Sequence, residues 1–219
     1  MSLRIVYDEK LTEIKSDILH MGGIAGEMGR LAVDAMLNGN IELANHVIGM
    51  DDEVDEFEKT ILNKTVSAVA LETPVASDLR MLVSTLGITG EIEKVADDAV
   101  KLARRATRLT GHFPAEMKVA LMDLGEAACK AFAASLRLYA EYNADLADSV
   151  IRSDKQIDGQ YVNARNRVLE LIRKNPAETE HLVRTIDAFH ALEHIADHAV
   201  EIAARLKFHN HGAPARLEA

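Results

Sequence analysis

The chain has 219 residues, of which 48% are hydrophobic, 27% are charged and only 4% are aromatic. Its formal net charge of −10 argues against nucleic acid as a partner, because binding to phosphate groups requires clustered Lys and Arg. The single cysteine, Cys129, excludes an internal disulfide and a cysteine-based zinc site, so we expect a cytoplasmic protein. The first residues lack the apolar run of a signal peptide, and no segment approaches the roughly 18 apolar residues of a membrane span.

The composition and the spacing of apolar residues both favour an all-α fold. Ala, Leu, Glu, Met, Lys and Arg are abundant, and these residues lose the least free energy on entering a helix. Apolar residues recur at spacings of three and four, which is the period of one helix face. We therefore expect six long helices, typical of antiparallel bundles, at about residues 8–37, 41–71, 75–109, 115–142, 144–173 and 178–208.

Turn-forming residues separate the expected helices. The segment 38–40 (Asn-Gly-Asn) and Asn143 each mark a turn between two helices. Pro74 and Pro176 follow Thr73 and Asn175, and a capping residue followed by proline is typical of a helix start. Another proline, within residues 110–114, predicts a break near the middle of the chain.

The two halves of the chain repeat one another. At an offset of 103, Gly22 and Asn40 meet Gly125 and Asn143, and a run of further residues matches in order. At an offset of 100 a second run matches, and the offset changes only in turns, where deletions are tolerated. We therefore predict a tandem repeat of two antiparallel three-helix bundles, with the first domain at residues 1–111 and the second at 112–219.

Four glycines lie within the first expected helix, although each costs about 1 kcal/mol relative to alanine there. Small residues let two helix backbones approach closely, so we expect these positions to face a neighbouring helix. The alternative is a hinge or kink in the helix. The positions are Gly22, Gly23, Gly26 and Gly29.

Two pairs of carboxylates spaced by four residues recur at equivalent positions in both halves. This spacing places both members of a pair on one helix face, about 5–6 Å apart at Cβ, where their like charges repel. Two such pairs on neighbouring helices would offer several hard oxygen ligands to a divalent or trivalent cation. The candidate metal ligands are Asp51, Asp55, Glu93 and Asp97 in the first half, and Asp154, Asp158, Glu193 and Asp197 in the second.

A helical wheel at about 100° per residue places Glu93 and Asp97 away from the apolar face. Apolar residues such as Ile92 and Ala96 cluster on one side, whereas Glu93 and Asp97 lie beside Lys101. The acidic pairs should therefore face outward or a groove between helices, not the core. A solvated acidic face paired with Lys101 would give the same pattern, but it need not keep carboxylates at equivalent positions in both halves.

Three histidines spaced by four, His190, His194 and His198, accompany the acidic stripe of the second half. They could form a polar helix face, or one of them could join the second metal site and change its metal preference. In the first half the matching positions include Lys94 and Asp98, so the two sites should be alike in framework but different in chemistry.

No catalytic constellation competes with metal binding. The sequence contains no Gly-rich phosphate loop, no serine elbow motif and no His-Glu-x-x-His. A ferritin-like di-iron site requires Glu-x-x-His on two helices, whereas His190 and Glu193 stand in the reverse order and Gly90 occupies the matching position. We expect no enzymatic activity, with a carboxylate-bridged metalloenzyme on a helical bundle as the alternative.

Four segments carry a family resemblance. Residues 43–55 end in the pair Asp51 and Asp55, and residues 74–80 read Pro-Val-Ala-Ser-Asp-Leu-Arg. Residues 93–97 read Glu-Lys-Val-Ala-Asp, and residues 193–197 read Glu-His-Ile-Ala-Asp. Together they resemble the PhoU family of phosphate-signalling proteins over nearly the whole chain.

The resemblance implies two three-helix bundles, a homodimer and multinuclear metal clusters on the bundle surface, with iron as the expected metal and zinc or nickel as alternatives. It also implies an adaptor between the Pst phosphate ABC transporter and the PhoR/PhoB two-component system, which restrains phosphate uptake and the phosphate-starvation response. An accessory protein of a different phosphate transporter is a further alternative. The family's Glu-Arg-Ile-Gly-Asp pattern is altered here, because Lys94 and His194 replace Arg, and Ala96 and Ala196 replace Gly. Since lysine cannot supply a bidentate guanidinium contact, surface contacts that need the arginine are in doubt.

Overall fold

The structure is a computed structural model that describes residues 3–72, 74, 76–109 and 111–211. Six long helices account for nearly all of these residues, which confirms the predicted all-α fold. The fourth and sixth predicted helices begin later than expected, because a 3₁₀ turn precedes each of them. The elements are α1 (Leu3–Asn38), α2 (Ile41–Glu72), α3 (Ala76–Leu109), η1 (Ala115–Met117), α4 (Lys118–Ala140), α5 (Ala144–Lys174), η2 (Pro176–Glu178) and α6 (Thr179–His211).

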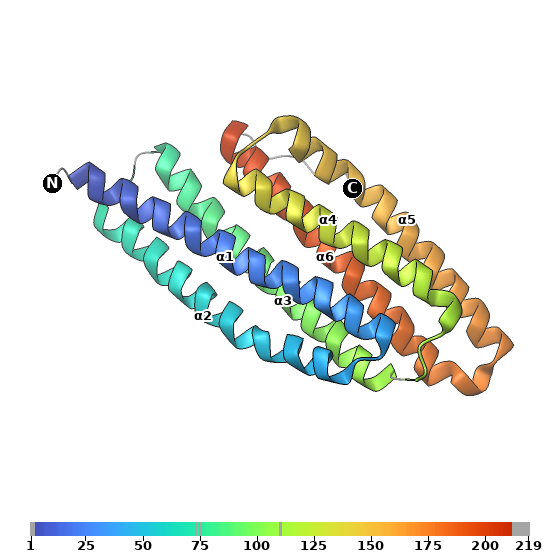
Figure 1. Ribbon diagram of the computed structural model, residues 1–219. Helices are drawn as coiled ribbons and strands as arrows, with labels where there is room; N and C mark the ends of the chain where they lie inside the picture. The colour runs from blue at the N-terminus through green and yellow to red at the C-terminus, as the bar shows by residue number, and fades with distance from the viewer. Residues whose placement is uncertain (1–2, 73, 75, 110, 212–219) are drawn as a thin grey trace.

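The helices form one elongated bundle, with α1, α3, α4 and α6 in the middle and α2 and α5 on its two sides (Figure 1). Within the first half α2 packs on α1 and α3, and within the second half α5 packs on α4 and α6. The halves join through contacts of α1 with α4 and of α3 with α6. The predicted boundary between residues 111 and 112 falls in the turn between α3 and η1.

The contact between α1 and α4 depends on two equivalent glycines. A Cβ atom built at Gly22 would lie 2.5 Å from the Leu136 side chain, and one built at Gly125 would lie 2.8 Å from that of Val33. Both glycines therefore permit a close approach, and the two contacts are related by the same offset of 103 that relates the repeats. Gly23 has no such neighbour within 4 Å, so the close approach predicted for the glycines of α1 holds at Gly22 and not at every position.

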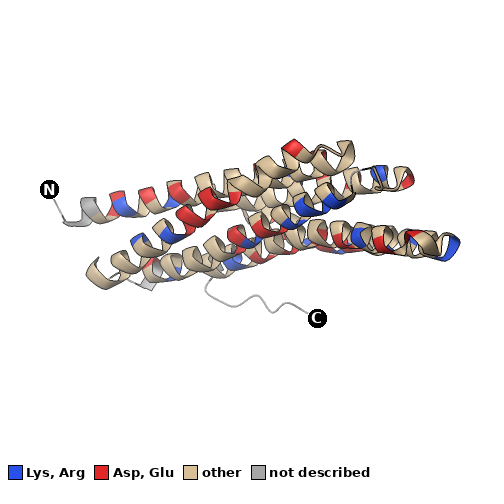
Figure 2. Ribbon diagram, turned by 90° about the horizontal axis from the view of Figure 1, so that it is seen from below, with Lys and Arg blue, Asp and Glu red and all other residues tan. Residues whose placement is uncertain are grey.

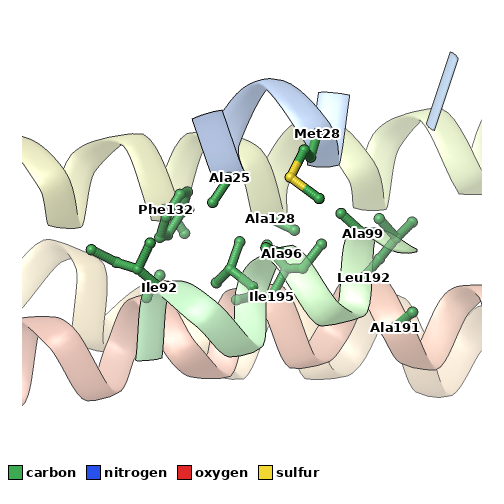
Figure 3. Close-up of a cluster of buried hydrophobic side chains, with 14 of the residues drawn as sticks. Ala25, Met28, Ile92, Ala96, Ala99, Ala128, Phe132, Ala191, Leu192 and Ile195 are labelled. Carbon is green, nitrogen blue, oxygen red and sulfur yellow. The ribbon is translucent and has the colours of Figure 1, made fainter. Parts of the chain in front are cut away.

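A single hydrophobic core runs through both halves. Figure 3 shows part of it, where Phe132 of α4 and Ile195 of α6 lie beside the small residues Ala25 of α1 and Ala96 of α3. Alanine lets the helix axes approach, and the larger side chains fill the remaining volume at interior packing density. Because the same core serves both repeats, the position of each outer helix is fixed by rigid central helices.

Asparagines in the predicted turns cap the second helix of each half. The side chain of Asn40 accepts a hydrogen bond from the Leu43 N–H at 3.0 Å, and that of Asn143 accepts one from the Leu146 N–H at 2.8 Å. Gly39 precedes the first cap with φ of 62°, a conformation that glycine adopts without strain. These caps satisfy N–H groups that the first helical turn leaves without partners.

The predicted starts at the two prolines have different outcomes. Pro176 is the first residue of η2, but the Asn175 side chain makes no capping bond there, so that part of the prediction is wrong. Instead, the hydroxyl of Thr179 donates to the Pro176 carbonyl at 2.7 Å. Thr73 and the predicted helix start at residue 75 lie outside the described residues. In the described part of the chain, no helix is both long enough and apolar enough to cross a membrane.

Candidate metal centre

The first set of carboxylates lies where α2 packs on α3. Burial raises the pKa of Asp51, and the negative charges of Asp55 on the same helix and Asp97 on α3 raise it further. Burial also raises the pKa of Glu93, with further contributions from Asp97, Glu58 and Asp55. The predicted residues of both helices are therefore brought close enough to repel one another.

The second set is compact. Asp154 and Asp158 of α5 and Asp197 of α6 each offer a carboxylate oxygen, and these three atoms lie within 4.8 Å of one another. Burial raises the pKa of Asp197 to about 6, and the charges of Glu193, Asp154 and Asp158 contribute in the same direction. Groups that repel in this way favour a bound cation or proton, which removes the repulsion.

The acidic sets face away from the hydrophobic core, as the helical wheel predicts. Val95 and Ala96 are fully buried, whereas the adjacent Asp97 is exposed and Glu93 is partly exposed. Figure 2 shows acidic and basic residues interspersed along the helices. Within this mixed pattern, the predicted carboxylates form local clusters at the contacts of α2 with α3 and of α5 with α6. Ions can reach these clusters from solvent.

Histidines distinguish the second set from the first. His190 and His194 each offer a nitrogen that lies within 4.8 Å of the other and of a Glu193 oxygen. Tyr161 lies on the same side, with its ring centroid 5.7 Å from that of His190, whereas Glu58 occupies the equivalent position of the first half. Two histidines thus lie beside the second acidic set, whereas the first acidic set has an additional carboxylate, Glu58.

The third histidine belongs to a buried polar network that the sequence did not reveal. His198 of α6 lies between two carboxylates of α3, with Nδ1 3.0 Å from Glu91 Oε2 and Nε2 3.3 Å from Asp98 Oδ2. The side chains of Glu91 and Asp98 are only 6% and 2% exposed. Lys94, Lys101 and Arg205 surround them, with Lys101 Nζ 2.8 Å from Asp98 and Arg205 Nη2 3.1 Å from Glu91.

The network holds one imidazolium between two carboxylates. The hydrogen bond from His198 lowers the pKa of Glu91 to about 2, against the effect of burial. Burial opposes the charged form of His198, but the hydrogen bonds and negative charges of Asp98 and Glu91 outweigh it and raise the pKa of His198 to about 9. At neutral pH His198 is therefore a cation that ties α6 to α3, and so joins the two halves.

The donor chemistry of both sets fits a metal ion. Carboxylate oxygens on two helices suit hard cations, and the imidazoles beside the second set also suit iron, zinc or nickel. At the second set an ion would be held by Asp154, Asp158 and Asp197, which converge, whereas the predicted ligand Glu193 lies with His190 and His194 instead. The predicted ligands of the first set interact through their charges but do not converge in this way among the described residues, so they would have to move together to hold an ion; they are Asp51, Asp55, Glu93 and Asp97. Such an ion would neutralise the clustered negative charge and link the outer helix of each half to its central neighbour.

Comparisons with known proteins are consistent with a repeat of one domain. A family model for the PhoU domain matches twice, at residues 18–106 and 121–206. A curated relative from Pseudomonas aeruginosa, named "Phosphate-specific transport system accessory protein PhoU homolog", is 32% identical over 90% of this chain and 82% of its own length. A relative of the same name from Rhizobium meliloti is 29% identical over 94% of this chain and 88% of its own length.

Solved structures share the architecture. A crystal structure of PhoU from Pseudomonas aeruginosa superimposes with a TM-score of 0.92 at 30% identity, over 94% of this chain and 100% of that one. The phosphate transport system regulatory protein PhoU from Streptococcus pneumoniae gives a TM-score of 0.89 over 96% of this chain and 100% of that one. At 23% identity the second likeness shows the fold alone.

Proposed function

The chain belongs to the PhoU family, and on that premise we propose that it negatively regulates phosphate uptake and the phosphate-starvation response. The observation that carries this proposal is the match over both repeats to relatives named as accessory proteins of the phosphate-specific transport system. In this role the protein acts in the cytoplasm as an adaptor between the Pst transporter and the PhoR/PhoB two-component system. It works by binding, without catalysis.

Metal binding is the second part of the proposal. The carboxylates of each set bind iron, with zinc or nickel as alternatives, in surface clusters that hold the outer helices α2 and α5 on the central bundle. The convergence of Asp154, Asp158 and Asp197 within 4.8 Å supports this assignment. The raised pKa of Asp197, to about 6, supports it too, because a cation relieves the repulsion that raises this pKa.

Partner binding tests the adaptor role. The purified chain should bind the ATP-binding component of the Pst transporter and the cytoplasmic part of PhoR, measured separately by biolayer interferometry. Its mass in solution should be that of a homodimer. Binding to neither partner would refute the adaptor role, and binding to the component of another phosphate transporter instead would favour the alternative accessory function.

Metal analysis tests the sites. A variant that carries Asp51→Asn, Asp55→Asn, Glu93→Gln and Asp97→Asn should lose the metal of the first set, measured by mass spectrometry of the purified protein. The matched control is Asp52→Asn with Glu53→Gln, which removes exposed carboxylates from the same segment of α2. Equal metal content in the variant, the control and the wild type would refute the first site. Oxygen consumption or phosphoester hydrolysis by the iron-loaded protein would favour the metalloenzyme instead.

A further inference from the structure

We propose that His112, Glu178 and His181 form a separate transition-metal site at one end of the bundle. Each residue offers one ligand atom, and these atoms lie within 4.8 Å of one another. The site lies where the turn between α3 and η1 meets η2 and the start of α6, at the lower right in Figure 1. It is distinct from both acidic sets, because His181 lies about 18 Å along α6 from Glu193, and it goes beyond the proposed function.

Two independent turns place the ligands. Gly111, with φ of 77°, reverses the chain after α3, and the N–H groups of His112 and Phe113 both donate to the Leu109 carbonyl, at 2.8 and 3.0 Å. Glu178 ends η2, where its N–H donates to the Asn175 carbonyl at 3.1 Å. The two turns therefore bring His112 and Glu178 to the end of the bundle where α6 carries His181.

The side chains of the site include a buried nitrogen that lacks a hydrogen-bond partner. The rings of His112 and His181 stack face to face, with centroids 4.2 Å apart and planes 3° apart. Nδ1 of His181 is buried and has no hydrogen-bond partner among the described residues. A nitrogen buried without a partner costs free energy, so a ligand that engages this imidazole gains by satisfying it. Because His112 is exposed, its ring can turn out of the stack to share an ion with His181.

The ligand types point to zinc or a similar first-row ion. Two imidazoles and one carboxylate are a common zinc set, and imidazole favours zinc, copper and nickel over magnesium or calcium. The same residues border a surface cavity of about 420 Å³ that also includes Glu116 and Asn175. Water in this cavity can complete the coordination. The acidic sets, rich in oxygen ligands, have a different metal preference.

A bound ion would tie the linker between the repeats to the second repeat. His112 lies between the two matched regions, 18–106 and 121–206, whereas Glu178 and His181 lie inside the second. The ion would thus fix the linker against the turn between α5 and α6. This contact lies at the end of the bundle, away from the contact of α3 with α6 made by His198.

The test is a Zn²⁺ titration of the full chain by isothermal calorimetry, with Cu²⁺ electron paramagnetic resonance to count coordinated nitrogens. His112→Gln and His181→Gln should each weaken Zn²⁺ binding at one class of site by more than about tenfold. Even the loss of a residue that only hydrogen-bonds to a metal ligand lowers metal affinity by that much. Each should also remove the nitrogen couplings of that site. His46→Gln, which changes an exposed histidine of α2, should leave both readouts unchanged.

Two further variants keep the outcome clear. The double variant His190→Gln with His194→Gln should retain the nitrogen couplings of the proposed site, because those histidines lie beside the second acidic set. His112→Gln changes an exposed residue of a turn, so its helical circular dichroism spectrum should match the wild type. Unchanged Zn²⁺ affinity and unchanged nitrogen couplings in His112→Gln and His181→Gln would overturn the proposal. Metal loss confined to the acidic-set variants would do the same while leaving the proposed function intact.

Discussion

Replacing His198 with glutamine is expected to destabilise the protein through the contact between its halves. The variant loses the hydrogen bonds to Glu91 and Asp98, at 3.0 and 3.3 Å, and leaves two almost fully buried carboxylates without their shared cation. Removing one partner of a buried ion pair costs about 3–5 kcal/mol. Lys94, Lys101 and Arg205 remain close to the carboxylates, so we expect about 3 kcal/mol, at the lower end of that range.

The assay is equilibrium urea denaturation at pH 7, followed by circular dichroism of the helices. The matched control is His194→Gln, because His194 is 40% exposed and its Nδ1 lies 3.6 Å from Asp98. Because the His194 ring is in contact with solvent and lies farther from Asp98 than His198 does, this contact should contribute less than about 1 kcal/mol. If His198→Gln lowers the free energy of unfolding no more than His194→Gln does, the assignment of His198 as a buried cation that helps to join the halves is wrong.

Four further predictions concern the pH dependence, the packing, the caps and the metal. The pKa of His198 is raised to about 9 in the folded protein, against about 6.5 in the unfolded chain, so its stabilising contribution is complete below pH 6.5 and is lost as the pH rises through 9. The free energy of unfolding of the wild type, measured in urea, should therefore fall between pH 7 and 9.5, and that of His198→Gln should fall less. Gly22→Leu should destabilise the protein by about 1–3 kcal/mol through overlap with Leu136, whereas Gly23→Ala, with no neighbour within 4 Å, should stabilise it by up to about 1 kcal/mol. Equal effects of the two variants on urea unfolding would contradict the close approach of α1 and α4 at Gly22. Asn143→Ala should lower the thermal unfolding midpoint through the loss of about 1 kcal/mol of capping, while Asn163→Ala, at an exposed site within α5, should not. The metal affinity of the second set should weaken as the pH falls below 6, because protons then compete for Asp197, whose pKa in the metal-free protein is about 6. An affinity that is the same at pH 7 and pH 5 would contradict the assignment of Asp197 as a ligand.

Local sequence patterns were sufficient to predict the helices and the acidic sets. Apolar spacing gave the helices to within a few residues at most ends, because each helix buries one face along its whole length. The offset between the repeats identified Gly22 and Gly125 as equivalent, and the structure uses both for close approach. Four-residue spacing placed the carboxylates on one face, which depends only on helix geometry.

The buried network depends on tertiary structure that no local pattern contains. Glu91 and Asp98 look like ordinary polar positions until α6 is packed antiparallel against α3, which brings His198 between them. A signal was present in the repeat, because Asp98 and His198 occupy equivalent positions with opposite charge. Equivalent positions meet only near the axis that relates the halves, and the sequence does not locate that axis. His112 was missed because the segment 110–114 was interpreted only as a break between helices.

The proposed restraint of phosphate uptake by this chain when phosphate is abundant can be tested directly in cells. The direct measurement is uptake of radiolabelled phosphate by cells that lack their own PhoU protein, grown in phosphate-rich medium with and without this chain. Uptake should be high without the chain and should fall when it is expressed, and a reporter of the phosphate-starvation response should fall with it. Equal uptake and equal reporter activity in both cultures, with the chain present and folded, would contradict the account.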